Sequence, residues 1–86
     1  MVKHAQLSDL RIMVALNKIE STVLEVDEQG MYRCYFEVRE GTEIVRYSLV
    51  TQRSNTPRPF KNPGTISRIL KAESIHHWRV VNVNRK

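Results

Sequence analysis

The stretch from Met31 to Arg39, MYRCYFEVR, decides the fold because its side chains alternate between two kinds of position. Alternate side chains of an extended strand point to opposite faces of a sheet. One set is apolar: Tyr32, Cys34, Phe36 and Val38. The other set is mostly charged: Arg33, Tyr35, Glu37 and Arg39. The pattern therefore predicts a strand with one buried face and one face open to solvent or to a ligand.

Two further strands are predicted on either side of this stretch. Residues 22–26, TVLEV, are rich in β-branched side chains, and residues 27–30, DEQG, form a turn that ends in a glycine. The turn at residues 40–42, EGT, leads to a strand over residues 43–51, which also alternates. The three strands are expected to form an antiparallel meander, with Tyr47 on its buried face and Tyr35 on its open face.

A helix is predicted from Ser8, its N-cap, to about Ser21. A turn of 100° per residue gives this helix two apolar faces. The face predicted to meet the core carries four residues: Ile12, Ala15, Leu16 and Ile19. The second apolar face carries Leu10, Met13 and Val14. Because a chain of 86 residues cannot bury a helix all round, this second face is predicted to form a homodimer interface; alternatively, Leu10 and Met13 lie at the rim of a small core.

The rest of the chain is predicted to hold a loop, a helix and a strand. Three prolines and several basic residues mark residues 52–64 as an extended basic loop, anchored to the core by Phe60. A short helix follows from Pro63 or Thr65 to Ala72, with Asn62-Pro63 as its N-cap and first residue and with Arg68 and Lys71 facing outward. Its N-terminus is expected to be able to accept a phosphate. Its apolar stripe is formed by Ile66, Ile69 and Leu70. Residues 75–83 are predicted to form a final strand, followed by a basic tail at residues 84–86.

These elements predict one α+β domain over residues 1–86. Its order is α-β-β-β-α-β, with an antiparallel sheet that carries both helices on one face. The other face of the sheet is left open.

The charge of the chain is unevenly divided along the sequence. Residues 1–43 carry a net charge of −3, whereas residues 44–86 carry a net charge of +8. Such an excess is what a polyanion-binding surface requires. An aromatic ring among cations suits nucleic acid, because a base stacks on it. The predicted nucleic-acid contacts are Arg33, Tyr35, Arg39, Arg46, Arg53, Arg58 and Lys61.

Catalytic, metal and cofactor chemistry is not indicated by any motif. His76 and His77 are adjacent on a predicted strand, so their side chains point to opposite faces and do not share a metal ion. Cys34 is expected to be a small core residue, and the three single glycines form no phosphate-binding loop. The carboxylates in turns and at strand ends are expected to be solvated. We therefore predict a protein that is not an enzyme and that has no cofactor or metal.

The location and alternative partners follow from the composition. No apolar run reaches the length needed to span a bilayer or to act as a signal peptide, and the lone cysteine cannot form an intrachain disulfide. A cytoplasmic protein without membrane contact is therefore expected. We predict non-catalytic binding of nucleic acid, with DNA favoured over RNA. The alternative is a homodimeric adaptor whose basic half meets an acidic protein surface.

Two families resemble parts of the chain. The order helix, three antiparallel strands, helix resembles the double-stranded-RNA-binding fold in topology, although residues 64–68, GTISR, hold one cation where that family has a lysine-rich motif. The tract formed by residues 48–53, 57–61 and 77–80 resembles the tail of small plasmid-borne proteins associated with replication or partition. The second resemblance implies an accessory protein of a bacterial mobile element. Neither resemblance transfers a functional residue to this chain.

Overall fold

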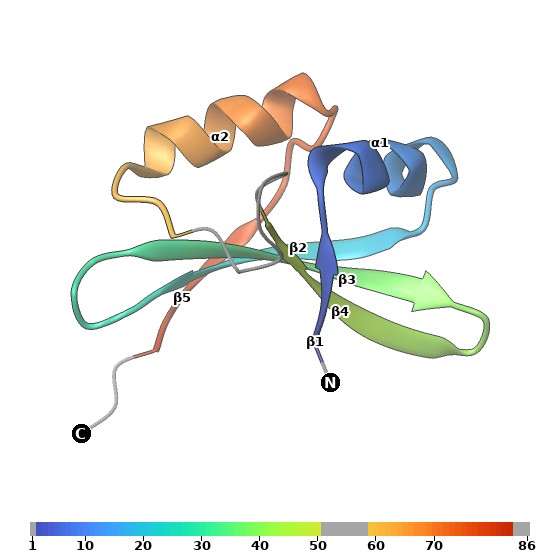
Figure 1. Cartoon of the computed structure of the whole chain (residues 1–86), viewed down its shortest axis with the longest axis horizontal. Coiled ribbons are helices and arrows are strands. Elements are labelled where there is room, and N and C mark those ends of the chain that lie inside the picture. Colours follow the sequence, from blue (N-terminus) through green and yellow to red (C-terminus); the bar gives the residue numbers. More distant parts are fainter. Residues whose placement is uncertain (1, 51–58, 84–86) are drawn as a thin grey trace.

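Two helices lie over the same face of a five-stranded sheet (Figure 1). The structure is a computed structural model that describes residues 2–50 and 59–83. The elements in chain order are β1 (Val2–Ala5), α1 (Leu7–Ala15), β2 (Ile19–Val26), β3 (Tyr32–Glu40), β4 (Glu43–Leu49), α2 (Pro63–Ala72) and β5 (Arg79–Asn82). The predicted α+β class and the placement of both helices on one face are confirmed.

The sheet is mixed, in the order β1-β4-β3-β2-β5. β2, β3 and β4 form the predicted antiparallel meander, but β1 pairs with β4 in parallel and β5 pairs with β2 in parallel. The prediction of an entirely antiparallel sheet was therefore wrong, and β1 was not predicted. The reason is that a helix lies between β1 and β2 and another between β4 and β5, and each helix returns the chain to the end of the sheet where the preceding strand began. The two strands on either side of each helix therefore run in the same direction. Because β2 and β4 are both antiparallel to β3, β1 is also parallel to β4, and β5 is also parallel to β2.

The core lies between the meander and the two helices. Cys34, Phe36 and Val38 of β3 are buried on the helix side, as the alternation predicted. Leu10 of α1 and Leu70 of α2 are fully buried against them. Each such side chain contributes roughly 1.5–3 kcal/mol by leaving water, so this layer supplies most of the stability of the domain.

Helix α1 is shorter than predicted, and its faces are reversed. It ends in a Schellman motif, in which Asn17 adopts a left-handed φ of 55° and the Lys18 N–H donates to the Met13 carbonyl at 2.9 Å. Ile19 therefore belongs to β2 rather than to the helix. Without it, the inward stripe consists of Leu7, Leu10, Met13 and Val14.

The residues predicted for the dimer interface therefore face the core of the protomer. Leu10 is 0% exposed, and Met13 and Val14 are partly buried against the core. Ile12 and Leu16, which were predicted to face the core, are 60% and 62% exposed. The prediction of a spare face at Leu10, Met13 and Val14 was wrong, because it rested on a helix that included Ile19.

Helix α2 has the predicted start, stripe and end. The Asn62 side chain accepts a hydrogen bond from the Gly64 N–H at 2.8 Å, and Pro63 occupies the first turn. Just before the helix, Phe60 exchanges two backbone hydrogen bonds of 2.8 Å with Tyr32, so its predicted anchoring role is confirmed. The final strand is shorter than predicted, since residues 75–78 leave the sheet and only Arg79–Asn82 pair with β2.

The predicted basic loop lies mostly outside the described residues, as does the basic tail at 84–86. Within the described part of the chain, neither helix has the length and apolar character that crossing a membrane requires.

Candidate nucleic-acid interface

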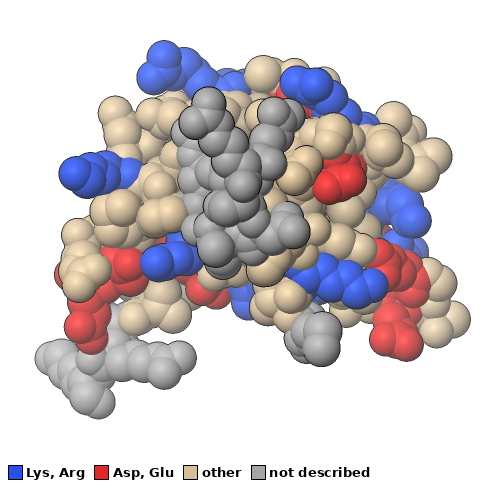
Figure 2. Space-filling model, viewed as in Figure 1, with Lys and Arg blue, Asp and Glu red and all other residues tan. Residues whose placement is uncertain are grey.

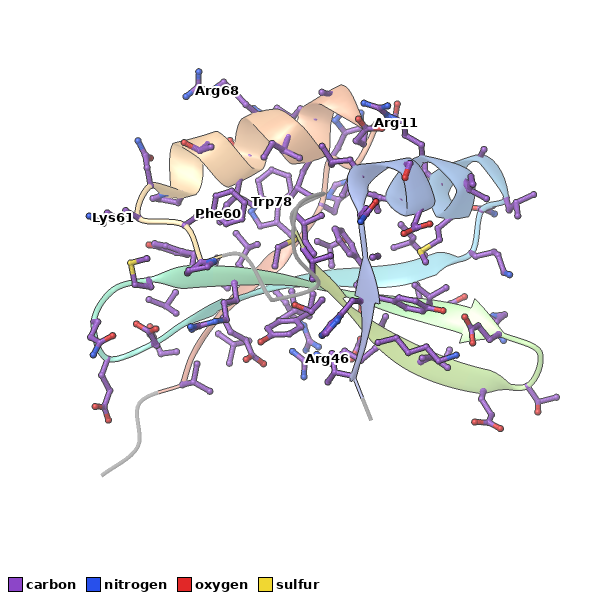
Figure 3. The ribbon with its side chains drawn as sticks, viewed as in Figure 1. Arg11, Arg46, Phe60, Lys61, Arg68 and Trp78 are labelled. Atoms are coloured by element: carbon purple, nitrogen blue, oxygen red, sulfur yellow. The ribbon has the colours of Figure 1, made fainter. Side chains whose placement is uncertain are left out.

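The sheet face opposite the helices gathers the arginines that the sequence predicted. The register of β3 with its neighbours places Arg33, Tyr35 and Arg39 of β3 and Arg46 of β4 on this face, which we call the open face. Arg46 lies on the side of the sheet away from the helices in Figure 3. Arg79 of β5 joins them, because it pairs with Val23 on the same face.

Each arginine of the open face lies against a carboxylate. The ion pairs are Arg33–Asp27 at 3.0 Å, Arg39–Glu20 at 2.8 Å, Arg46–Glu25 at 2.5 Å and Arg79–Glu37 at 3.8 Å. The acidic first half of the sequence and the basic second half therefore meet in the folded sheet. Because opposite charges within 4 Å largely cancel each other's field at longer range, the open face offers little attraction to a polyanion.

Tyr35 and Arg46 form the centre of the open face. The Arg46 guanidinium lies 4.3 Å from the centre of the Tyr35 ring, and burial, followed by the Glu25 charge, raises the pKa of the Tyr35 phenol. Val23, the strand partner of Tyr35, is only 3% exposed although the register places it on this face. The ring predicted to stack on a base is therefore already covered by a cation of the same chain.

Hydrogen bonds hold two carboxylates of the open face, Asp27 and Glu20, in their charged form. Asp27 accepts from the Met31 N–H at 3.0 Å, and this bond together with Arg33 lowers the pKa of the Asp27 carboxyl group. Arg39 likewise lowers the pKa of Glu20 by donating a hydrogen bond to it. These carboxylates stay ionised at neutral pH and keep their arginines compensated.

A second group of cations lies on α2 and just before it. Lys61, Arg68 and Lys71 are exposed, and none of them has a carboxylate within ion-pair distance among residues 2–50 and 59–83. Figure 3 shows Arg68 pointing away from the sheet and Lys61 pointing outward to the side, just before α2. Figure 2 shows basic groups over α2 that stand apart from acidic groups, whereas basic and acidic groups touch lower on the molecule. We call these three residues the α2 cations.

The α2 cations were only partly found from the sequence. Lys61 was among the predicted contacts, and Arg68 and Lys71 were expected to face outward but were not assigned to the site. Their spacing of three residues on the polar side of a helix is the signal that identifies them as neighbours. The N-terminus of α2 was expected to accept a phosphate, but its Gly64 N–H already donates to Asn62. Arg53 and Arg58 lie outside the described residues.

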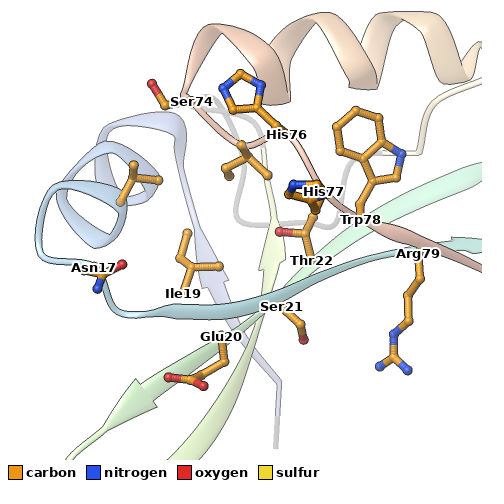
Figure 4. A pocket seen from close by; sticks show the side chains of 12 residues that line it. Asn17, Ile19, Glu20, Ser21, Thr22, Ser74, His76, His77, Trp78 and Arg79 are labelled. Carbon is orange, nitrogen blue, oxygen red and sulfur yellow. The ribbon is translucent and has the colours of Figure 1, made fainter.

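A pocket of about 450 Å³ opens between the end of α1, the start of β2 and residues 74–79 (Figure 4). His76, His77 and Trp78 line it together with Asn17 and Ser74. Within the described residues, no three His, Cys, Asp or Glu side chains are close enough together to hold a metal ion. Elsewhere, burial raises the pKa of the Cys34 thiol to about 12, so this thiol is protonated at neutral pH.

Comparison with known proteins gives no assignment, since no family model, no curated protein sequence and no solved structure shows a significant match to the chain.

Proposed function

We propose that this protein binds nucleic acid without catalysis, and that the α2 cations make the main contacts with the phosphate backbone. The observation that carries the proposal is the contrast in pairing, since the arginines of the open face are compensated while the α2 cations are not. Uncompensated lysine and arginine side chains release counterions from nucleic acid when they meet its phosphates. We take DNA as the first ligand to test, as the sequence favoured.

The expected binding is weak, sensitive to salt and independent of base sequence. Three phosphate contacts give a slope of log K against log salt of about −3, far below that of strong DNA-binding proteins. Phosphate contacts position a protein on nucleic acid but do not read bases, and Tyr35 is covered by Arg46. Arg53 and Arg58 stay predicted contacts from the sequence and would steepen this slope.

The test is a binding titration with duplex DNA, single-stranded DNA and duplex RNA at about 50 mM and about 200 mM salt. The variant Lys61→Gln/Arg68→Gln/Lys71→Gln is compared with the charge-matched control Lys3→Gln/Arg33→Gln/Arg39→Gln. We expect the α2 variant to flatten the salt slope by about 3 and the control to change it by less than about 1. Equal effects of the two variants would contradict the assignment to α2, and no salt-dependent binding to any nucleic acid would contradict the function.

A second candidate function is a homodimeric adaptor that binds an acidic protein surface. The α2 cations complement an acidic surface as well as they complement phosphates. The exposed side chains of Ile12 on α1 and of Leu16, the residue that caps the end of α1, add apolar area of the kind that protein interfaces cover. The same titration separates the two functions, because an adaptor leaves all three nucleic acids unbound at low salt.

A further inference from the structure

The outer edge of β5 presents unpaired backbone groups together with exposed apolar side chains. All four residues of β5 are exposed, and Val80 and Val81 are 56% and 37% exposed. Among the described residues, β5 pairs with β2 only. The Val83 N–H donates to the Val26 carbonyl at 2.9 Å, so by alternation residues 79, 81 and 83 face β2. The N–H and C=O groups of Val80 and Asn82 therefore point away from the sheet.

The opposite edge of the sheet, β1, is protected against pairing with a further strand, whereas β5 is not. β1 carries Lys3, whose ammonium group pairs with Glu40 at 3.3 Å and lies 5.9 Å from the centre of the Tyr47 ring. Charged side chains on an edge strand are a common device against pairing with other strands. β5 has no proline and no bulge, and its one charge, Arg79, stands at the first residue of the strand, outside the segment of Val80 and Asn82 whose backbone groups face outward. An edge of this kind accepts another strand readily.

We propose that two copies of this chain pair through β5, antiparallel and about a two-fold axis, so that their sheets join into one. The register that uses every outward backbone group of β5 places Val81 opposite Val81 of the partner subunit. Val80 then lies opposite Asn82 of the partner subunit and Asn82 lies opposite Val80 of the partner subunit, and each of these two pairs exchanges two hydrogen bonds. The Val81 pair between them makes none, because its backbone groups face β2. Side chains opposite each other lie on the same face of the joined sheet, as an antiparallel pair requires.

Charge and packing both permit this register. The two Val81 side chains meet in a position where opposite Cβ atoms are about 5 Å apart, which gives close apolar contact. Arg79 lies opposite Val83 of the partner subunit, so no two like charges face each other across the axis. The axis is perpendicular to the sheet, so the helices of both copies lie on the same side.

The dimer is expected to be weak. One short strand pair buries less than the roughly 1,200 Å² that stable interfaces bury, which places the dissociation constant on the order of 10–100 μM. The pairing is independent of nucleic-acid binding, because β5 and the α2 cations share no residue. Loss of one is therefore distinguishable from loss of the other.

The experiment is sedimentation equilibrium of the full chain up to about 500 μM, with two variants that act differently on the edge. Val80→Pro removes an outward N–H and leaves the hydrogen bonds to β2 intact. Val81→Lys sets two ammonium groups against each other across the axis. We expect each to raise the dissociation constant at least about tenfold. The controls are Val81→Thr, which keeps the branched shape, and Ile12→Lys on α1; both are expected to change the constant less than about twofold.

A folding check and an exchange measurement complete the test. Urea denaturation shows whether each variant is folded, and amide hydrogen exchange of the unmodified chain should show protection of Val80 and Asn82 that rises with protein concentration. A monomer at about 500 μM would overturn the proposal. So would a dimer that Ile12→Lys dissociates and the β5 variants do not.

Discussion

The open face of the sheet and the outer side of α2 carry similar numbers of cations and differ in what stands beside them. On the open face, strand pairing brings Glu20, Glu25, Asp27 and Glu37 next to four arginines. On α2, no carboxylate lies within ion-pair distance of the cations among the described residues. A count of charges along a chain therefore does not measure its attraction for a polyanion, because the fold decides which charges cancel.

The two regions also differ in what their cations do for stability. Arg46 pairs with Glu25 and covers the Tyr35 ring, so it is part of the packing of the sheet. Arg68 and Lys71 stand in solvent, and exposed side chains of this kind contribute little to folding. This difference gives three measurable expectations.

The largest expected effect comes from Arg46→Ala. It removes an ion pair and a cation–π contact and leaves the partly buried Glu25 without its partner. We expect the free energy of unfolding to fall by about 2 kcal/mol in urea denaturation, against less than about 0.5 kcal/mol for the control Arg68→Ala. A similar loss from both variants would remove the distinction between the two regions.

A smaller effect is expected at Tyr35. Tyr35→Ala exposes the underside of Arg46 and should lower the free energy of unfolding by about 1 kcal/mol, because the ring is only half-buried. Tyr35→Phe keeps the ring and should cost less than about 0.5 kcal/mol. Neither variant is expected to weaken nucleic-acid binding. Weaker binding by Tyr35→Ala at unchanged stability would restore the open face as the binding site.

The smallest effect is expected on acidification. The pKa values of Glu20 and Asp27 are lowered in the fold by Arg39 and by the Met31 N–H with Arg33. Carboxyl groups of this kind stabilise the fold above their unfolded pKa near 4, and that contribution is lost as the pH falls through the lower folded value.

The measurement is the urea midpoint at about pH 6 and about pH 2.5, for the unmodified chain and for Glu20→Gln/Asp27→Asn. The drop between the two pH values should be smaller in the variant, because it lacks both titrating groups. A matched pair on α2, Arg68→Gln/Lys71→Gln, should leave the drop unchanged. An equal drop in all three proteins would show that these two carboxylates do not contribute to the loss of stability in acid.

The central part of the fold could be predicted from the sequence because its signals are local. Alternation in residues 31–39 assigned the two faces of β3 correctly, and Asn62-Pro63 marked the start of α2. The edge strands could not be predicted in the same way. β1 has four residues, three of them exposed, and its partner β4 lies about half the chain away, so no local pattern identifies the pair.

The reversed face of α1 has a local cause that the apolar pattern concealed. Asn17 can adopt the left-handed conformation that ends a helix, but the apolar spacing continues through Leu16 and Ile19 across this end. In the candidate site, the arginines of the open face could be predicted from the sequence, but the carboxylates that neutralise their charge could not. Ion pairs such as Arg46–Glu25 join different strands, and their geometry depends on the register of the whole sheet.

The parallel pairing of both edge strands has a consequence for the order in which the protein folds. The meander of β2, β3 and β4 joins neighbouring segments through short turns, whereas β1 and β5 each find their partner across about half the chain or more. Loop-closure entropy delays such distant contacts, so the meander is expected to form in the transition state and the edges to dock after it. Substitutions in β5 should then speed unfolding and leave the folding rate nearly unchanged.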